Sequence, residues 1–306
     1  MGVLPPTFKS GFVSIVGLPN VGKSTLLNIL IGEKVSIVSP RPQTTRNRTL
    51  GVKNLPDTQI VFIDTPGIYK PENMLGKYLV SEALKGLSNV DIIYFVVTAL
   101  SGIDEQGEII QLLLKAKCKI FLVINKIDIA QKQMLLPLIE QYNKALNFAA
   151  IVPVSALKGE GIETLLDITK ENLVYGPRYY PDDIYTDQLE RHMCQEIIRE
   201  KLLKHTYEEI PQSIAVEVIS WKEKNRAKMS GRLKTLISIE AEIYIEKDSQ
   251  KGIIIGKDGS RLKIAGTAAR IELEGLLDSK VFLKLFVKVR KNWRRDALAL
   301  RDMGYK

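Results

Sequence analysis

A glycine-rich stretch early in the chain has the residue types and spacing that hold phosphate. Its sequence, Gly17-Leu18-Pro19-Asn20-Val21-Gly22-Lys23-Ser24, follows an apolar run at 12–16 and precedes a helix-like run that begins with Thr25. A strand, then GxxxxGKS, then a helix is the context of a phosphate-binding loop. The glycines let successive N–H groups face one phosphate chain, and the helix N-terminus adds its positive end. An ordinary glycine turn is the alternative.

Three further positions predict a magnesium ion beside those phosphates. The Lys23 ammonium can reach the β- and γ-phosphates, and the Ser24 hydroxyl can bind Mg²⁺. Thr45 lies in a polar, proline-containing loop at 40–48, which can close over Mg²⁺ and the γ-phosphate; a basic surface loop is the alternative. Asp64 ends an apolar run, where a buried carboxylate needs a cation or hydrogen-bond partner. We expect Ser24, Thr45 and Asp64 at the metal, and Lys23, Thr45 and Gly67 at the reacting phosphate.

The stretch Asn125-Lys126-Ile127-Asp128 follows another apolar run and predicts a choice of base. Guanine presents two adjacent donors, N1–H and the 2-amino group, and the Asp128 carboxylate can accept from both. Adenine lacks that pattern, so the site rejects it by roughly 10⁴ or more. Asn125 can brace the phosphate loop, and the stem of Lys126 can pack over the ring. An ATP site is the alternative, and Asp128 argues against it.

A third strand-end stretch completes the predicted nucleotide site. The residues Ser155, Ala156 and Leu157 follow the apolar run at 151–154, and the Ala156 N–H can donate to guanine O6. The motifs occur in order along the chain, each where a predicted strand ends. We therefore predict a guanine-nucleotide site that binds GTP and GDP.

The first part of the chain alternates strand-like and helix-like segments, which predicts the α/β class. In such mostly parallel sheets, ligands bind at the carboxyl ends of the strands, so the loops above can converge. Gly67 follows the predicted strand that ends at Asp64 and can bring its N–H close to a γ-phosphate. The expected strands are 11–16, 49–54, 59–64, 90–98, 118–124 and 150–154, and the expected helices are 23–32, 75–87, 104–116, 132–146 and 161–173.

The second part of the chain predicts a smaller α+β domain. The glycine- and proline-containing segment 176–185 reads as a linker between domain 1–175 and domain 186–306. The expected elements that follow are a helix at 186–205, a strand at 211–220, a polar turn at Lys222–Arg232 and a strand at 235–246. After them we expect a short helix at 249–255, the turn Gly256-Lys257-Asp258-Gly259, a longer helix that ends at about 277, a strand at 281–290 and a short terminal helix.

That element order matches a KH (type II) RNA-binding domain, in which two helices meet at a GxxG turn. The turn lets an RNA backbone approach closely, and an apolar face around Ile253–Ile255 and Ile264 can hold about four bases. A small domain that binds protein is the alternative. Trp293 with Arg294 and Arg295 can stack on a base and grip phosphate, or Trp293 can pack under the terminal helix. The expected RNA-binding residues are Ile255, Gly256, Lys257, Asp258, Gly259, Arg261 and Lys263.

Composition limits the class of protein. The 306 residues carry a net charge of +9, and segment 280–306 holds nine basic and two acidic residues. Such a basic tail suits a polyanion, either nucleic acid or an anionic membrane surface, while solvated surface charge is the alternative. Apolar runs are too short to cross a bilayer, and Met1–Ser10 lacks the pattern of a secretion signal, so we expect neither a membrane span nor secretion.

With both parts in view, the chain resembles the Era family of bacterial ribosome-associated GTPases. The resemblance rests on the motifs quoted above, on Gln43-Thr44-Thr45-Arg46, Asp64-Thr65-Pro66-Gly67 and Ser155-Ala156-Leu157-Lys158, and on the isoleucines before the GxxG turn. It implies GTP hydrolysis with Mg²⁺, binding near the 3′ end of 16S ribosomal RNA rather than DNA, and a role in assembling the 30S subunit. It also implies a cytoplasmic protein that can associate peripherally with the inner membrane.

One position departs from the pattern of Ras-like switches. Ile68 stands where a glutamine orients the attacking water, and its side chain cannot hydrogen-bond. The resemblance implies that the threonine loop replaces it, together with K⁺ held by Asn20; a turn-capping asparagine is the alternative. We expect slow hydrolysis. A signalling GTPase whose second domain docks a protein or a membrane is the alternative function.

Overall fold

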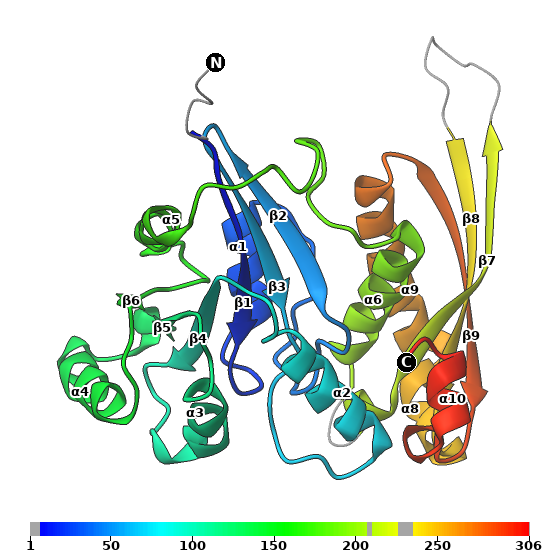
Figure 1. The fold of residues 1–306 in the computed structure, drawn as a ribbon. Helices are drawn as coiled ribbons and strands as arrows, with labels where there is room; N and C mark the ends of the chain where they lie inside the picture. Colours follow the sequence, from blue (N-terminus) through cyan, green and yellow to red (C-terminus); the bar gives the residue numbers. More distant parts are fainter. Residues whose placement is uncertain (1–6, 207–209, 226–234, 306) are drawn as a thin grey trace. The chain divides into compact units, whose positions relative to one another are not determined.

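The computed structural model describes residues 7–206, 210–225 and 235–305, and these form two compact units (Figure 1). The first unit comprises Met1–Val38, Thr45–Glu72 and Gly76–Asp187, and the second comprises Ser39–Thr44, Asn73–Leu75 and Gln188–Lys306. None of the described helices is long and apolar enough to span a bilayer.

The first unit is built on a six-stranded sheet in the order β2-β3-β1-β4-β5-β6. All neighbouring strands run parallel except β2, which is antiparallel to β3. The parallel strands therefore end at one edge of the sheet, where their loops meet. The strands are β1 (Lys9–Val16), β2 (Thr49–Leu55), β3 (Thr58–Asp64), β4 (Ile92–Thr98), β5 (Lys119–Asn125) and β6 (Ala150–Pro153).

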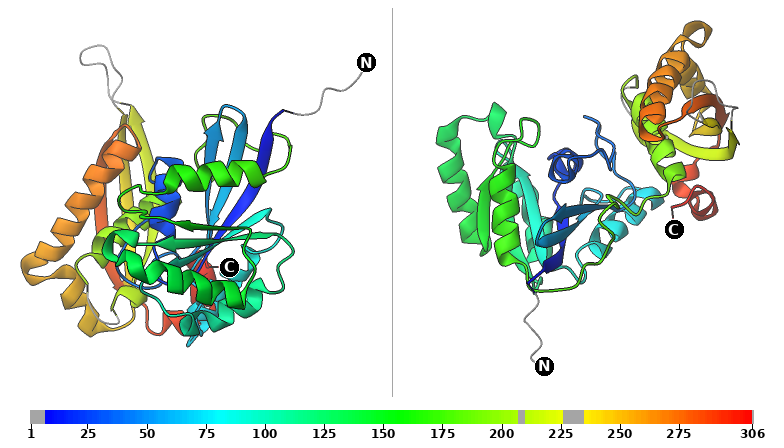
Figure 2. Two further views of the ribbon diagram at one scale, coloured as in Figure 1. Left: turned by 90° about the vertical axis from the view of Figure 1, so that its left-hand side faces the viewer. Right: turned by 90° about the horizontal axis from the view of Figure 1, so that it is seen from above.

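Helices cover both faces of this sheet, as the views in Figure 2 show. Successive strand residues point to opposite faces, so each face has its own apolar core. On one face, α1 (Lys23–Ile31) and α5 (Ile162–Asn172) pack on residues such as Val13 and Tyr94. On the other face, residues such as Phe95 pack against α2 (Met74–Lys85), α3 (Gly107–Leu113) and α4 (Leu135–Ala145).

The second unit has a three-stranded sheet with helices on one face. Its order is β7-β8-β9, with β7 (Ala215–Asn225) antiparallel to β8 (Thr235–Ile245) and β9 (Lys280–Val289) parallel to β8. One shared core joins the sheet to α6 (Glu190–Leu203), α8 (Asp248–Ile255) and α9 (Ser260–Leu276). The remaining helices are α7 (Ile210–Ser213) and α10 (Ala297–Asp302).

The predicted fold class is confirmed: a mostly parallel α/β domain is followed by a smaller KH domain. The strand predicted to begin at 211 was wrong at its start, because α7 occupies Ile210–Ser213. Pro211 has no N–H to give to a sheet and is tolerated in the first turn of a helix, where Ser213 Oγ donates to the Ile210 carbonyl at 2.8 Å. Most of the predicted turn Lys222–Arg232 lies outside the described residues, as does most of Met1–Ser10.

The segment predicted as a linker runs along strands of the first unit. Gln59, in β3, accepts hydrogen bonds from the N–H groups of Tyr179 and Tyr180, at 2.7 and 3.0 Å, and donates to the Tyr180 carbonyl at 2.8 Å. Further along, the Val52 N–H donates to the Tyr185 carbonyl at 2.8 Å. This segment is therefore held on β2 and β3 up to the boundary between the units.

Candidate functional sites

The phosphate-binding loop follows β1 and leads into α1, and two of its glycines leave no room for a side chain. A Cβ on Gly17 would lie 2.3 Å from the Val96 carbonyl oxygen, and one on Gly22 would lie 2.3 Å from Asn125 Nδ2. Gly22 also has a φ of 96°, in the left-handed region. No side chain of a residue that the structure describes caps the N-terminus of α1, so its first N–H groups are available to an anion.

Lys23 is buried, and its ammonium group bonds to the loop itself. The Nζ atom donates to the carbonyls of Gly17 and Leu18, at 3.1 and 2.8 Å. Burial lowers the pKa of Lys23 to about 8, against the opposing effect of the Asp64 carboxylate. An anion in the loop would raise this pKa again, because a negative charge favours the protonated form.

Asp64, at the end of β3, is the centre of a buried group of oxygen atoms. Its Oδ2 accepts from Ser24 Oγ at 2.7 Å and from Ser36 Oγ at 3.3 Å, and Ser24 Oγ lies 2.8 Å from Thr45 Oγ1. Asp64 Oδ1 is buried and has no hydrogen-bond partner among the described residues. Burial raises the pKa of this carboxyl. An unsatisfied carboxylate oxygen beside two hydroxyls suits a hard cation such as Mg²⁺.

The loop after Asp64 touches the phosphate loop directly. A Cβ on Gly67 would lie 2.7 Å from the Pro19 backbone nitrogen, and the Ile68 N–H donates to the Gly17 carbonyl at 3.3 Å. The Ile68 side chain is buried in the apolar core between the sheet and α2, α3 and α4. Its side chain is aliphatic and packs in this core, so it cannot hydrogen-bond to an attacking water molecule.

Asn125, at the end of β5, joins three loops. Its Nδ2 donates to the Val21 carbonyl at 2.9 Å, and its Oδ1 accepts from the N–H groups of Ala156 and Lys126 at 3.0 and 2.8 Å. Asn125 is only 2% exposed, so each of these bonds replaces a lost contact with water. The side chain fixes the predicted base-binding loops against the phosphate loop.

The other base-binding residues lie beside Asn125. Buried Ser155 donates from Oγ to Asp128 Oδ1 at 2.6 Å, which orients the exposed carboxylate. The ammonium of Lys126 reaches the Asn20 carbonyl at 2.7 Å. Exposed Asn20 has a φ of 64°, and no hydrogen bond joins its side chain to the residues that the structure describes. Of the remaining predicted residues, Pro19 lies within the loop, Thr25 follows it in α1, and Leu157 is exposed.

Two residues of this site had not been predicted. Ser36 donates to Asp64, as described above, and Asn28 places it. Asn28 Oδ1 accepts from the N–H groups of Val35 and Ser36, and its Nδ2 donates to the Ser36 carbonyl at 2.8 Å. A polar residue within the apolar run at 25–31 was the available signal for Asn28, and no spacing in the sequence marks Ser36.

In the second unit, the Gly256–Gly259 turn joins α8 to α9. Gly256 and Gly259 both have a φ of 75°, and Asp258 has a φ of 52°. A Cβ on Gly259 would meet no atom within 4 Å, so the outer side of the turn is open. Lys257 and Asp258 are exposed, and Arg261 Nη1 donates to the Ile253 carbonyl at 3.2 Å.

The apolar residues predicted beside this turn differ in exposure. Ile253 and Ile264 are 37% and 55% exposed, whereas Ile254 is buried in the core. Ile255 is half-buried, and Lys263 is exposed on the first turn of α9. The open turn, which carries Lys257, therefore lies between the exposed Ile253 of α8 and the exposed Arg261, Lys263 and Ile264 of α9.

Of the two alternatives for Trp293, the structure shows packing. The ring is fully buried, Nε1 donates to the Ser213 carbonyl at 3.0 Å, and the indole stacks on Tyr305. Arg294 Nε donates to Glu246 Oε2 at 2.9 Å, so its charge is already paired. Arg295 is exposed.

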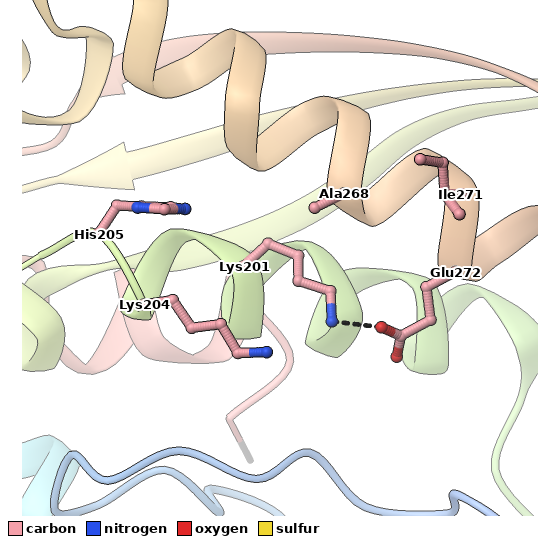
Figure 3. Close-up of a pocket in the computed structure, with 6 residues that line it drawn as sticks. All are labelled: Lys201, Lys204, His205, Ala268, Ile271 and Glu272. Carbon is pink, nitrogen blue, oxygen red and sulfur yellow. Dashed lines mark ion pairs between the residues drawn. The ribbon is translucent and has the colours of Figure 1, made fainter.

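A pocket of about 350 Å³ lies between α6 and α9 (Figure 3). Ala268 and Ile271 form its apolar part, with His205 at one end. Its lysines are already paired with carboxylates: Lys201 contacts Glu272, and Lys204 Nζ lies 3.2 Å from Glu200 Oε1. Lys201 is only 9% exposed and is paired with both Glu272 and Glu200, so its charge is not available to an added phosphate.

Comparisons with known proteins agree with this division of the chain. A family model described as 50S ribosome-binding GTPase matches residues 12–126, and a KH domain model matches residues 209–294. The chain is 50% identical to a GTPase Era of Geobacter metallireducens over 299 residues, 97% of this chain and 98% of that protein. It is 48% identical to a GTPase Era of Staphylococcus haemolyticus over 298 residues, 97% of each.

Two solved structures have the same fold over almost the whole chain. One is Era in complex with MgGDPNP and nucleotides 1506–1542 of 16S ribosomal RNA, with a TM-score of 0.91, 43% identity and coverage of 97% of this chain and 99% of that chain. The other is a single-residue variant of Aquifex aeolicus Era bound to GDP·AlF4⁻, with a TM-score of 0.90 and the same identity and coverage.

Proposed function

The chain belongs to the Era family of GTPases, and on this basis we propose that it is an RNA-binding GTP switch in assembly of the 30S subunit. It hydrolyses GTP to GDP and phosphate and binds the 3′ region of 16S ribosomal RNA through its KH domain. The proposed domains are 1–175 and 186–306, joined by 176–185. The observation that carries the nucleotide part is Asn125, which links the phosphate loop to both base-binding loops.

In the proposed binding mode, the phosphates take the place of the protein's own acceptors at Lys23. The ammonium that now bonds to the Gly17 and Leu18 carbonyls neutralises the β- and γ-phosphates, and the N–H groups at the start of α1 add donors. Asp128, oriented by Ser155, accepts from guanine. The Ala156 N–H, which donates to Asn125 Oδ1 in this structure, exchanges that acceptor for guanine O6 when the base binds. These groups hold GTP in one orientation for attack by water.

The oxygen cluster around Asp64 is the proposed magnesium site. Ser24, Thr45 and Asp64 hold the ion, directly or through water, and the unpartnered Asp64 Oδ1 fits this assignment. When bound, Mg²⁺ neutralises charge that develops on the transferred phosphoryl group. Because Thr45 belongs both to this cluster and to the loop at 40–48, we expect the loop to become ordered when the nucleotide and Mg²⁺ bind.

The aliphatic side chain of Ile68, which is buried in the core, cannot hydrogen-bond to the attacking water, so this proposal assigns water positioning to other groups. We assign it to the loop of Thr45 and to Gly67, with Asn20 holding a potassium ion beside the phosphates. The exposed Asn20 side chain, with no hydrogen bond to a described residue, is free to take that part. Turnover measured in K⁺ and in Na⁺, for the wild type and Asn20→Ala, tests the assignment; equal rates in all four conditions would refute it.

The test of nucleotide choice is a swap at the base. Asp128→Asn should lose affinity for GDP and gain affinity for xanthosine diphosphate, because the new amide donates where guanine also donates and xanthine accepts. Calorimetry with GDP, ADP and xanthosine diphosphate measures the change. A wild-type protein that binds ADP as tightly as GDP would overturn the guanine site.

The test of the RNA part uses the open turn. Gly259→Asp places a carboxylate and a strained backbone on the open side of the turn, where an RNA phosphate would lie, so binding to a 16S 3′-end fragment should fall strongly. Gly256→Asp should also lose binding, because its Cβ would lie 2.9 Å from the Arg261 backbone nitrogen and displace the turn. Gly275→Asp, in α9 with open space around its Cβ, is the control. Sedimentation with purified 30S and 50S subunits shows whether the protein binds the proposed 30S subunit or the 50S subunit, which the description of the matched GTPase family names. Association with 50S alone would exclude the 30S proposal.

The alternative is a signalling GTPase whose second domain docks a protein or a membrane. The basic segment 280–306 suits an anionic membrane surface as well as RNA. We propose a cytoplasmic protein with peripheral association at the inner membrane. Flotation with vesicles rich in anionic lipid tests this surface, and binding to vesicles without binding to the 16S fragment would favour the alternative.

A further inference from the structure

The outward face of β9 combines aromatic and basic side chains in strict alternation. One set of its residues, including Val281 and Leu285, faces the core shared with α6, α8 and α9. The other set points away from that core and is described here as the outer row of β9. The outer row consists of Lys280, Phe282, Lys284, Phe286 and Lys288.

The two phenylalanines of the outer row are unusually exposed for their size. Phe282 is 51% exposed and Phe286 is 43% exposed, four residues apart on one strand. At about 3.3 Å for each residue, the two rings lie roughly 13 Å apart, so each can contact a different base of one strand. The Lys284 ammonium lies over the Phe282 ring, 5.6 Å from its centroid, so a cation accompanies this ring.

The three lysines of the outer row are exposed, and each is paired with a carboxylate; Lys280 Nζ lies 3.6 Å from Glu274 Oε2. Lys284 pairs at 3.4 Å with Glu240 and Lys288 pairs at 2.5 Å with Glu242, and both glutamates lie on the neighbouring strand β8. Both lysine side chains are at least half exposed, and such pairs stabilise a fold little, so the lysines can exchange partners. Beyond the strand, the exposed Lys291 and Arg295 continue the basic run.

We propose that the outer row of β9 is a second RNA-binding surface, on which single-stranded RNA stacks its bases. Phe282 and Phe286 provide flat faces for two bases, and the intervening lysines neutralise the backbone. The geometry suits RNA better than a protein, because an apolar protein surface would have to bury Lys284 between the rings. The surface is distinct from the Gly256–Gly259 turn, and the choice of RNA over DNA rests on the proposed function.

The test removes the rings and keeps the apolar volume. Anisotropy of a fluorescein-labelled oligo(U) of about 20 nucleotides measures affinity for wild type, Phe282→Leu with Phe286→Leu, and Phe282→Trp with Phe286→Trp. The leucine pair should bind at least about tenfold more weakly, because stacking on each ring is lost, and the tryptophan pair should keep wild-type affinity. Leu298→Ala, another exposed apolar side chain, is the control and should bind as wild type does. An unchanged GTP hydrolysis rate and melting temperature verify that each variant is folded.

The outcomes separate this surface from the Gly256–Gly259 turn. If the leucine pair binds oligo(U) as tightly as wild type, both alone and when Gly259→Asp is added to both proteins, the outer row of β9 does not bind RNA. The proposed use of the KH turn would still stand. If Gly259→Asp leaves the affinity for oligo(U) unchanged but the leucine pair loses it, the outer row of β9 is the RNA-binding surface and the proposed use of the turn fails. Equal binding of an oligo(dT) of the same length would refute the preference for RNA. A leucine pair that loses only a protein partner would also overturn the proposal.

Discussion

Asn125 is the residue at which the phosphate and base parts of the nucleotide site meet. Its one amide serves Val21 in the phosphate loop and Ala156 and Lys126 in the base-binding loops. A buried amide with three backbone partners fixes three loops that are up to 135 residues apart in sequence (Val21 to Ala156). At this scale, the site depends on an amide that donates on one side and accepts on the other.

Replacement of Asn125 by alanine should therefore destabilise the three loops even in the protein without nucleotide. We expect the free energy of unfolding to fall by about 1–3 kcal/mol, because buried backbone groups lose their partners. Affinity for GDP should fall at least about tenfold. Denaturant unfolding and calorimetry measure the two effects, and Asn143→Ala, an exposed asparagine on α4, is the control. Normal stability in Asn125→Ala would contradict this account.

The lowered pKa of Lys23 predicts that nucleotide binding takes up a proton. With a pKa of about 8 in the free protein, Lys23 is half-protonated near that pH, and bound phosphate raises its pKa. Affinity for GDP should therefore weaken as pH rises through about 8. Calorimetry at this pH in buffers of different ionisation enthalpy should show uptake of about half a proton, since half of the lysines are neutral there.

A control variant identifies the group that takes up the proton. Lys126→Arg removes the other lysine of the site, whose ammonium lies at the Asn20 carbonyl, and should leave the uptake unchanged. Loss of uptake in Lys126→Arg, or its absence in the wild type, would show that Lys23 is not the titrating group.

At the scale of elements, β3 links the nucleotide site to the segment that leaves the first unit. Its last residue, Asp64, lies in the oxygen cluster, and Gln59 in the same strand holds the backbone of Tyr179 and Tyr180. Gln59 is fully buried, and its amide bonds to groups inside the protein. A segment with the composition of a free linker is thus part of the folded unit.

Gln59→Leu should release this segment. The substitution leaves backbone groups of Tyr179 and Tyr180 unpaired, so we expect a loss of stability of about 1–3 kcal/mol. Limited proteolysis should cut near Tyr180 faster than in the wild type, and mass spectrometry locates the cut. Gln141→Leu on the exposed face of α4 serves as control. Equal cleavage in both variants would show that Gln59 does not hold the segment.

At the scale of the whole molecule, the two units have separate cores. Among the described residues, the first unit has an apolar core on each face of its sheet, and the second has its core on one face. Within that part of the chain, every buried residue of the second unit's core belongs to the second unit. Ligand binding to one unit therefore stabilises that unit directly.

Calorimetric unfolding should show two transitions, and GDP with Mg²⁺ should raise the midpoint temperature of only one of them. At about 100 times the dissociation constant, the ligand adds about 2.7 kcal/mol to the unit that binds it. Leu273→Ala, in the second core, should lower the stability of the other unit by about 2–5 kcal/mol, whereas the exposed Leu276→Ala should not. A single transition that moves as a whole in both experiments would show that the units unfold together.

The sequence alone determined the fold class and the positions of the strand-end loops. Apolar runs with periods of about two and 3.6 residues identified most strands and helices, because those periods are local properties of the backbone. The motifs then placed glycine, lysine and carboxylate side chains at strand ends, and topology brings such ends together. Pro211 was the local signal that was missed, and it explains why β7 begins late.

Only the tertiary structure decided which residues meet across the chain. Ser36 at Asp64, Gln59 at Tyr179 and Trp293 at Ser213 join residues that are 28, 120 and 80 positions apart. Such pairs leave no period in the sequence, because they depend on how whole elements pack rather than on the neighbours of either residue. Burial is decided in the same way, and for that reason Ile68 lies in the core while Phe282 lies on the surface.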